Sequence, residues 1–394
     1  MTGPAAAPAR SQTPWRLGVL VPVTIGCAFA ADLTLRMLPH DLFSFRAWEA
    51  TRTPGEDAPF LRNHRYHSDR TYGNLAAVGN LRAFRQYRSV TFTTDELGYA
   101  NAPDLARRGG AAAIVFGSSF AAGSELGDDS TLAAQLARQT GRTVYNAGGG
   151  DPNFAEIRWL ARRLVAPGGL VILEYPERGD VPFITPVHVT HRTARCREVI
   201  APRLTGVCSV LGWLARHAAV SPLQILAQRG LKLLQDDRWL PNPYAGTVLQ
   251  ARLRDGQGML FLAQERVAFH LAAPDAPAVR YVRWLDRKLG RENFRVLVVL
   301  VPRKYTVYAP LLDPPDPGPD QSAPYLDRVE QGLRAAGISV VNLTARFRAA
   351  ATAALGRGGA GGGSIYFPDD THWNAAGAAL AARDIARTWG GLEP

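Results

Sequence analysis

The sequence predicts an α/β fold in which a parallel central sheet is covered on both faces by helices. From residue 111 onward, four apolar runs (AAAIVFG, TVYNAG, LVILEY and FRVLVVLVP) alternate with segments of helical periodicity. Buried parallel strands are continuous apolar runs, and crossover helices connect them. The composition, with 46% hydrophobic and 20% charged residues among 394, is typical of a globular chain. We predict helices at about 129–140, 153–166, 277–289, 323–336, 343–355 and 375–389.

The N-terminal segment 1–39 resembles an export signal. Arg10 and Arg16 precede an uncharged apolar run at 17–31, LGVLVPVTIGCAFAA. A basic region followed by an apolar core is typical of a signal sequence. One interpretation is an uncleaved signal anchor that holds the chain in the inner membrane. The second is a signal peptide cleaved after AFA (28–30), and the third is a buried core helix. The first two interpretations put the rest of the chain in the periplasm, tethered or soluble.

Two further parts follow along the chain. Residues 40–110 are irregular and rich in Arg, Asn and Tyr, which predicts a wrapping segment with short strands such as YRSVTFTTDELGYAN. Residues 111–394 form the α/β domain, with an insert at about 183–275. The insert is largely helical in VLGWLARHAAVSPLQILAQRGLKLL, and GMLFLAQERVAFHL predicts a hairpin. A substrate-binding cap and packing against the outer helices both fit such an insert. Within it, Cys196 and Cys208 fit a disulfide or two free thiols, and their spacing does not suit a zinc site.

The formal net charge of +11 does not predict a nucleic-acid partner. Only three of the 45 basic side chains are lysines, and the arginines are scattered without a dense basic block. The glycine-rich run GRGGAGGGS (356–364) lacks a following GKS or GKT and does not open a helix. We therefore expect a loop there and not a phosphate cradle. The sequence predicts neither a metal nor an organic cofactor.

A serine and a histidine stand at positions that suit nucleophilic catalysis. Ser119 follows the first apolar run in GSSF, at a strand-to-helix turn where open α/β sheets bind ligands. A serine hydroxyl needs a base to become a nucleophile at neutral pH. His372 lies on a loop before a helix in YFPDDTHWNAAG. A carboxylate two or three residues earlier, Asp370 or Asp369, can fix the tautomer of this imidazole.

Three blocks, VFGSSFAAG, VYNAGGGDPN and FPDDTHWNAAG, resemble the SGNH/GDSL hydrolase superfamily in their order and spacing. The resemblance covers about residues 90–390 without the insert and implies a three-layer α/β/α fold with acyl-ester chemistry. It implies Ser119 as the nucleophile, the amides of Ser119 and Gly148 as the oxyanion hole, and His372 as the base. The acid stays open between the two aspartates, and the Trp-Asn pair after the histidine favours Asp370.

The chain departs from the superfamily pattern at two points. Ser118 stands where relatives have an aspartate, and the third-block asparagine has no clear counterpart in LVILEYPERGD. Arg178 in this run is a candidate oxyanion donor or sugar contact, because a guanidinium offers several N–H groups. An ion pair with Glu174 or Glu177 is the alternative role.

A narrower resemblance lies in LVVLVPRKYTVY (297–308), which is followed later by DTHW. It is similar to the periplasmic proteins that O-acetylate alginate and related exopolysaccharides, although their histidine block precedes the serine block. The candidate substrate-binding residues are Arg178, Asn153, Lys304 and Trp373. For Lys304, packing in a strand-end loop is the alternative.

The two resemblances imply serine-dependent acyl-ester chemistry on an extracytoplasmic carbohydrate, as an O-acetyltransferase or an acetylesterase of an exopolysaccharide. For a transferase, they imply a membrane-bound O-acyltransferase as the partner that supplies the acyl group. The alternative from another class is a non-catalytic carbohydrate-binding scaffold in a polysaccharide export or modification complex. The missing third-block asparagine and the large insert favour that alternative.

Overall fold

The structure of this chain is a computed structural model, and it describes residues 13–38, 42–52, 58–150, 152–177, 221–236, 239–242, 245–266, 275–316, 325–355 and 363–392. Arg178, Cys196 and Cys208 lie outside the described residues, as does most of the predicted insert. The sugar contact and the disulfide therefore stay predictions.

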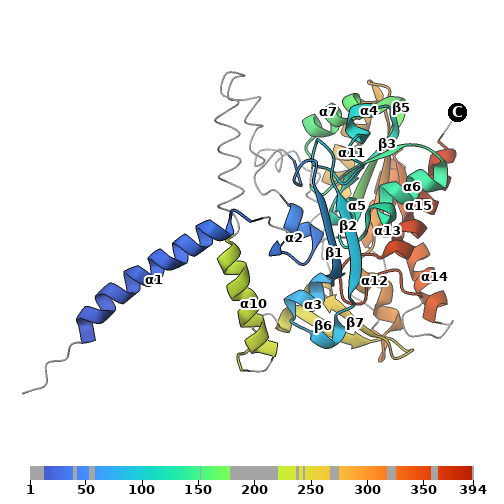
Figure 1. The fold of residues 1–394 in the computed structure, drawn as a ribbon. Helices are drawn as coiled ribbons and strands as arrows, with labels where there is room; N and C mark the ends of the chain where they lie inside the picture. Colours follow the sequence, from blue (N-terminus) through green and yellow to red (C-terminus); the bar gives the residue numbers. More distant parts are fainter. Residues whose placement is uncertain are drawn as a thin grey trace, which may run out of the picture.

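A five-stranded parallel sheet forms the centre of the fold (Figure 1). Its strand order is β4-β3-β5-β8-β9, and every neighbouring pair is parallel. The strands are β3 (Ala111–Gly117), β4 (Val144–Gly148), β5 (Val165–Pro176), β8 (Arg295–Val301) and β9 (Ser339–Asn342). The four apolar runs of the sequence are β3, β4, β5 and β8, which confirms the predicted α/β fold. The sequence did not predict β9, whose SVVN run is too short to stand out.

Helices cover both faces of this sheet. The face that carries Val115 and Leu297 packs against α6 (Leu132–Thr140), α14 (Thr344–Leu355) and α15 (Ala375–Gly390). The face that carries Phe116 and Val298 packs against α7 (Phe154–Leu164), α11 (Asp275–Gly290) and α13 (Tyr325–Ala335). Side chains alternate between the faces along a strand, so β3 contributes to both cores. These helices are the six predicted segments, with ends that differ by at most three residues.

Two antiparallel hairpins flank the sheet. β1 (Arg65–Thr71) pairs with β2 (Arg88–Thr93), and β6 (Val248–Arg252) pairs with β7 (Gly258–Leu262). In the predicted hairpin GMLFLAQERVAFHL, the GMLFL run is β7, whereas residues 267–271 lie outside the described residues, so the pairing within this run stays a prediction. The turn between β6 and β7 contains an Asp-Gly pair in which Gly256 has φ +84°. That left-handed conformation suits glycine and makes Asp-Gly a strong hairpin turn.

The N-terminal helix α1 (Thr13–Leu35) extends away from the domain (Figure 1). Its residues 18–35 are long and apolar enough to cross a membrane, and none of that window is buried. This fits the predicted signal segment, as an anchor or as a signal sequence. Helix α10 (Pro222–Asp236) begins beside the C-terminal end of α1 and covers the second half of the predicted helical run of the insert.

Short helical elements complete the described chain. They are α2 (Ala47–Thr51), α3 (Asn74–Val78), η2 (Arg82–Phe84), α4 (Leu105–Arg108), α5 (Ser119–Ala122), η3 (Asp128–Ser130), η7 (Ala245–Thr247), η8 (Ala263–Arg266), α12 (Lys304–Tyr308) and η9 (Ala309–Leu311).

Candidate active site

The turn after β3 presents Ser119 at the first position of the short helix α5. Ser118 is the N-cap of α5, and its hydroxyl oxygen accepts a hydrogen bond from the Phe120 amide at 3.2 Å. Gly123 ends the helix in the left-handed region, at φ +87°. A serine cap and a glycine stop are the residues that favour so short a helix. The turn therefore holds Ser119 at the carboxyl edge of the parallel sheet, where ligands bind in such folds.

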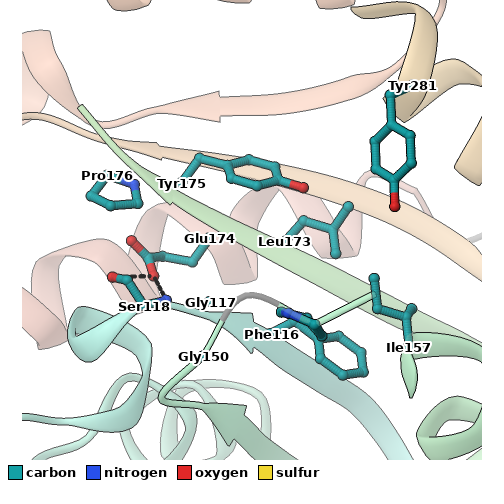
Figure 2. Close-up of a pocket in the computed structure, with 11 residues that line it drawn as sticks. Phe116, Gly117, Ser118, Gly150, Ile157, Leu173, Glu174, Tyr175, Pro176 and Tyr281 are labelled. Atoms are coloured by element: carbon teal, nitrogen blue, oxygen red, sulfur yellow. Dashed lines mark hydrogen bonds between the residues drawn. The ribbon is translucent and has the colours of Figure 1, made fainter. Parts of the chain in front are cut away.

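Glu174, near the end of β5, anchors this turn through hydrogen bonds to Ser118 (Figure 2). Its Oε2 accepts hydrogen bonds from the Ser118 amide at 2.7 Å and from the Ser118 hydroxyl at 2.9 Å. The side chain of Glu174 is only 1% exposed. A Cβ on Gly117 would lie 2.3 Å from Glu174 Oε2, so the strand approaches closely only because residue 117 is glycine. An aspartate at position 118 would oppose a second buried carboxylate, which explains why serine suits this chain.

The cavity beside Glu174 is too small for a substrate. It has a volume of about 40 Å³ and is bordered by Ser118, Gly150 and Tyr281, among others (Figure 2). That volume suits a few water molecules and not a sugar ring.

His372 connects Ser119 to a buried carboxylate. Its Nε2 lies 2.7 Å from Ser119 Oγ, and its Nδ1 lies 2.6 Å from Asp370 Oδ1. The same Asp370 oxygen accepts a hydrogen bond from the His372 amide at 2.9 Å. This geometry places Nε2 of the imidazole toward the serine, and of the two candidate acids it is Asp370 that contacts the ring.

The electrostatic surroundings keep Asp370 ionised. Burial by itself would raise the pKa of this fully buried carboxyl, but His372, Arg46 and Arg88 hold the pKa well below its usual range. Arg46 Nη1 lies 3.9 Å from Asp370 Oδ2. A carboxylate that stays charged at neutral pH can stabilise an imidazolium.

Asp369 has a different role, because its side chain faces away from the imidazole. Oδ2 accepts hydrogen bonds from the amides of Gly73 at 2.7 Å and Gln86 at 3.0 Å, and Oδ1 binds Arg88 Nη1 at 3.0 Å. This buried carboxylate thus ties the histidine loop to the N-terminal wrapping segment.

Asn74 adds a second tie between the same two segments. Its amide donates to Asp370 Oδ2 at 2.6 Å, and its side chain exchanges two hydrogen bonds with Thr371. The sequence analysis missed Asn74, since no local pattern marks a contact between residues 296 positions apart.

Lys304 also stabilises the histidine loop, and its side chain is buried. Its Nζ donates to the carbonyl oxygens of Leu260 and Phe367 at 2.7 Å, of Pro368 at 2.9 Å and of Asp370 at 3.0 Å. Burial lowers the pKa of Lys304 to about 7, and the neighbouring carboxylates oppose that shift. With 1% of its surface exposed, Lys304 cannot contact a substrate in this structure, so the predicted substrate role is wrong.

Trp373 also departs from its predicted substrate role, because it is fully buried in the core. Its ring packs edge-on against Phe120 at 5.1 Å between centroids, which braces α5 against the histidine loop. Asn153 is partly exposed and caps α7, where its Oδ1 accepts from the Glu156 amide at 2.9 Å. Its contact with a substrate stays a prediction.

The predicted oxyanion role of Gly148 does not fit the structure. The Gly148 amide donates to Asn146 Oδ1 at 2.9 Å. A Cβ on Gly148 would lie 2.3 Å from the Ala122 nitrogen, so this glycine is packed against α5 and faces no open space. Within the described residues, the Ser119 amide has no hydrogen-bond acceptor. As the first N–H of a helix, it is available to an oxyanion.

Glu125 is a buried acid near the site, and it shares Arg46 and Arg88 with the two aspartates of the histidine loop. Arg46 Nη1 and Arg88 Nη2 lie 3.5 and 3.7 Å from its oxygens. Burial raises the pKa of Glu125 to about 8, and the nearby negative charge of Asp370 adds to the effect. Sequence reasoning missed Glu125, Arg46 and Arg88, which carry no motif. Among the described residues, no cluster of three or more His, Cys, Asp or Glu side chains is arranged to hold a metal ion.

A comparison with protein families gives one match. Residues 256–391 match the family of the SGNH hydrolase-like domain, acetyltransferase AlgX. The match confirms the resemblance drawn from the sequence motifs. It contains Lys304, Asp370 and His372, whereas Ser119 lies outside the matched segment. No curated protein matches the chain. The matched segment covers the histidine loop of the site, and the serine turn comes earlier in the chain.

Proposed function

We propose that this chain is an acyltransferase in which Ser119 carries an acyl group from an ester donor to a carbohydrate hydroxyl. One observation carries the proposal: hydrogen bonds run from Ser119 Oγ through both ring nitrogens of His372 to Asp370, over distances of 2.7 and 2.6 Å. Such a row of nucleophile, base and orienting acid is the arrangement that activates a serine hydroxyl.

In the proposed reaction, His372 Nε2 takes the Ser119 hydroxyl proton while Oγ attacks the carbonyl carbon of the donor ester. The carbonyl oxygen gains negative charge and is stabilised by the Ser119 amide. The donor C–O bond then breaks, and the leaving alcohol takes the proton from His372. A sugar hydroxyl attacks the acyl-serine by the reverse sequence, and water in its place gives hydrolysis. Asp370 holds the ring and stabilises its charged form throughout.

For the acceptor we propose an exopolysaccharide in the periplasm. The family description supports an acetyltransferase, and α1 is long enough to hold the chain in the inner membrane. The acyl donor in this scheme comes from a membrane-bound O-acyltransferase. The exposed helix α1 and the motif LVVLVPRKYTVY are compatible with a membrane-anchored enzyme that modifies an exopolysaccharide.

A chromogenic acetyl ester tests the catalytic proposal. We expect the wild type to hydrolyse it, Ser119→Ala to lose the activity, and Ser130→Ala, a matched change on the nearby η3, to keep it. Equal rates for Ser119→Ala and the wild type would contradict the proposal. An oligosaccharide acceptor then separates transfer from hydrolysis, because transfer adds an acetyl group to the acceptor mass.

The position of the Gly148 amide favours a second candidate function, a non-catalytic carbohydrate-binding scaffold. An oxyanion hole that lacks one donor costs on the order of 10² to 10³ in rate. Oligosaccharide binding without turnover, unchanged in Ser119→Ala, would support the scaffold.

A further inference from the structure

Helix α10 exposes a row of leucines on one side. At 3.6 residues per turn, Leu226, Leu231 and Leu234 fall on one side of the helix, whereas Arg229 and Lys232 fall on the other side together with Leu233, which is 60% exposed. The first three leucines are 40–45% exposed. Apart from Val78 and Tyr87, the large exposed hydrophobic side chains of the described residues all lie on α1, in the segment that follows it, on α10 or just after α10. Among the described residues, two neighbouring elements and the segments that follow them thus carry nearly all of the exposed large hydrophobic side chains.

The start of α10 is fixed to the end of α1. Asp32 Oδ1 accepts hydrogen bonds from the hydroxyl of Ser221 and from the Leu223 amide, the latter at 3.2 Å. In Figure 1, α10 begins beside the C-terminal end of α1 and extends away from it. The apolar window 18–35 ends at this junction. An 18-residue helix at 1.5 Å per residue nearly spans a hydrocarbon core of about 30 Å, so α10 would begin at the bilayer surface.

The opposite side of α10 borders a groove of about 810 Å³. Aromatic and cationic side chains line it, namely Phe43, Phe45, Trp48, Tyr72, Arg52, Arg85, Arg229 and Lys232. Arg229 donates to the Phe43 carbonyl at 2.5 Å, and Lys232 donates to the Ala77 carbonyl at 2.8 Å. The carboxylate among the described lining residues, Glu49, binds Arg46. The groove is therefore positively charged and large enough for a lipid headgroup.

We propose that α10 lies in the headgroup layer of an anionic phospholipid bilayer, with its leucines inserted and its groove-facing cations bound to lipid phosphate. The proposal rests on the proposed anchoring by α1 and adds a second membrane contact. A helix with one apolar side and cations on the other binds at such an interface. Charge complementarity and continuity with α1 select an anionic bilayer as the occupant. Phe45 lines the groove and Arg46 reaches Asp370, so the docked surface would lie next to the histidine loop.

The insertion of α10 is tested with an environment-sensitive fluorophore on the full chain. Cys27, Cys196 and Cys208 are replaced by serine, and a single label site is made by Leu234→Cys or, as the control, by Thr352→Cys at an exposed position of α14. We expect the label at 234 to shift to the blue in vesicles of phosphatidylcholine with phosphatidylglycerol and to be quenched by doxyl lipids. The label at 352 should keep its emission in water.

Two outcomes would overturn the proposal, and they differ. A chain that floats with the vesicles while the 234 label stays water-like refutes the α10 contact and leaves the α1 anchor standing. A chain that does not float with the vesicles refutes both contacts.

The charge part of the proposal has its own variants. Arg229→Glu with Lys232→Glu should remove the dependence of the 234 signal on phosphatidylglycerol and its weakening by salt. Arg107→Glu with Arg291→Glu, a matched charge reversal on exposed residues elsewhere, should keep both. An unchanged phosphatidylglycerol dependence in the first pair would refute lipid phosphate as the ligand of these cations.

Discussion

Replacing Glu174 by alanine should separate positioning of the nucleophile from general folding. The carboxylate makes two short hydrogen bonds to Ser118, at 2.7 and 2.9 Å, and Glu174 is only 1% exposed. In Glu174→Ala the Ser118 amide loses its acceptor. Losing this acceptor costs about 3–6 kcal/mol of unfolding free energy, because each of the two hydrogen bonds to the charged group contributes about 1.5–3 kcal/mol.

The catalytic effect of the same change follows from geometry. Ser118 and Ser119 are adjacent, so a turn that loses its anchor moves Oγ relative to His372 Nε2. A displacement of about 1 Å can cost on the order of 10² in rate. We therefore expect kcat for the acetyl ester to fall about 10²-fold with a small change in KM.

Glu174→Gln is the control for this experiment, since its amide oxygen can still accept from the Ser118 amide and hydroxyl. Its kcat should stay within about tenfold of the wild type, in line with the loss of about 1 kcal/mol. Thermal denaturation measures the stability of both variants in parallel. A Glu174→Ala enzyme with wild-type kcat, or equal losses in the Ala and Gln variants, would refute the positioning argument.

Further predictions concern the supporting residues. Asp370→Asn should lower kcat on the order of 10⁴-fold, whereas Asp369→Asn should mainly lower the melting temperature, because of these two residues only Asp370 contacts the imidazole. Steady-state kinetics and melting curves of the two variants measure these effects. Equal losses of kcat in the two variants would contradict the assignment of Asp370 as the acid. Lys304→Met should lower the unfolding free energy by about 3–5 kcal/mol, because four buried carbonyl oxygens lose their donor, and a denaturant titration measures it. Glu125 has a pKa raised from 4.5 to about 8, so the folded state binds a proton that the unfolded state releases, and its contribution to stability falls as pH rises between these values. Glu125→Gln should therefore gain stability relative to the wild type as pH rises through that window, and a constant difference would contradict the pKa assignment.

Four of the five sheet strands could be predicted because they have local signals, and the two candidate site residues stand in local motifs as well. β3, β5 and β8 are continuous apolar runs, and Ser119 and His372 each lie in a short motif next to a helix start. The supporting contacts have no such signal. Asp369 reaches Gly73 across 296 positions, and only the folded chain brings them together.

The errors have physical causes as well. Lys304 and Trp373 lie within the motifs LVVLVPRKYTVY and DTHW, but a motif does not determine whether a side chain can reach the substrate. Exposure is set by packing, and both side chains are buried. The direction of the Gly148 amide depends on the local backbone and on the Asn146 side chain, which a motif does not encode.

The most direct test of the central claim is to trap the acyl-enzyme. The protein is mixed with an acetyl ester, quenched with acid and digested, and the peptides are analysed by mass spectrometry. We expect one added acetyl group on the peptide that contains Ser119, at Ser119 itself, and none in His372→Ala. Ester turnover with an unmodified Ser119, or an acetyl group on Ser118 instead, would contradict the central claim.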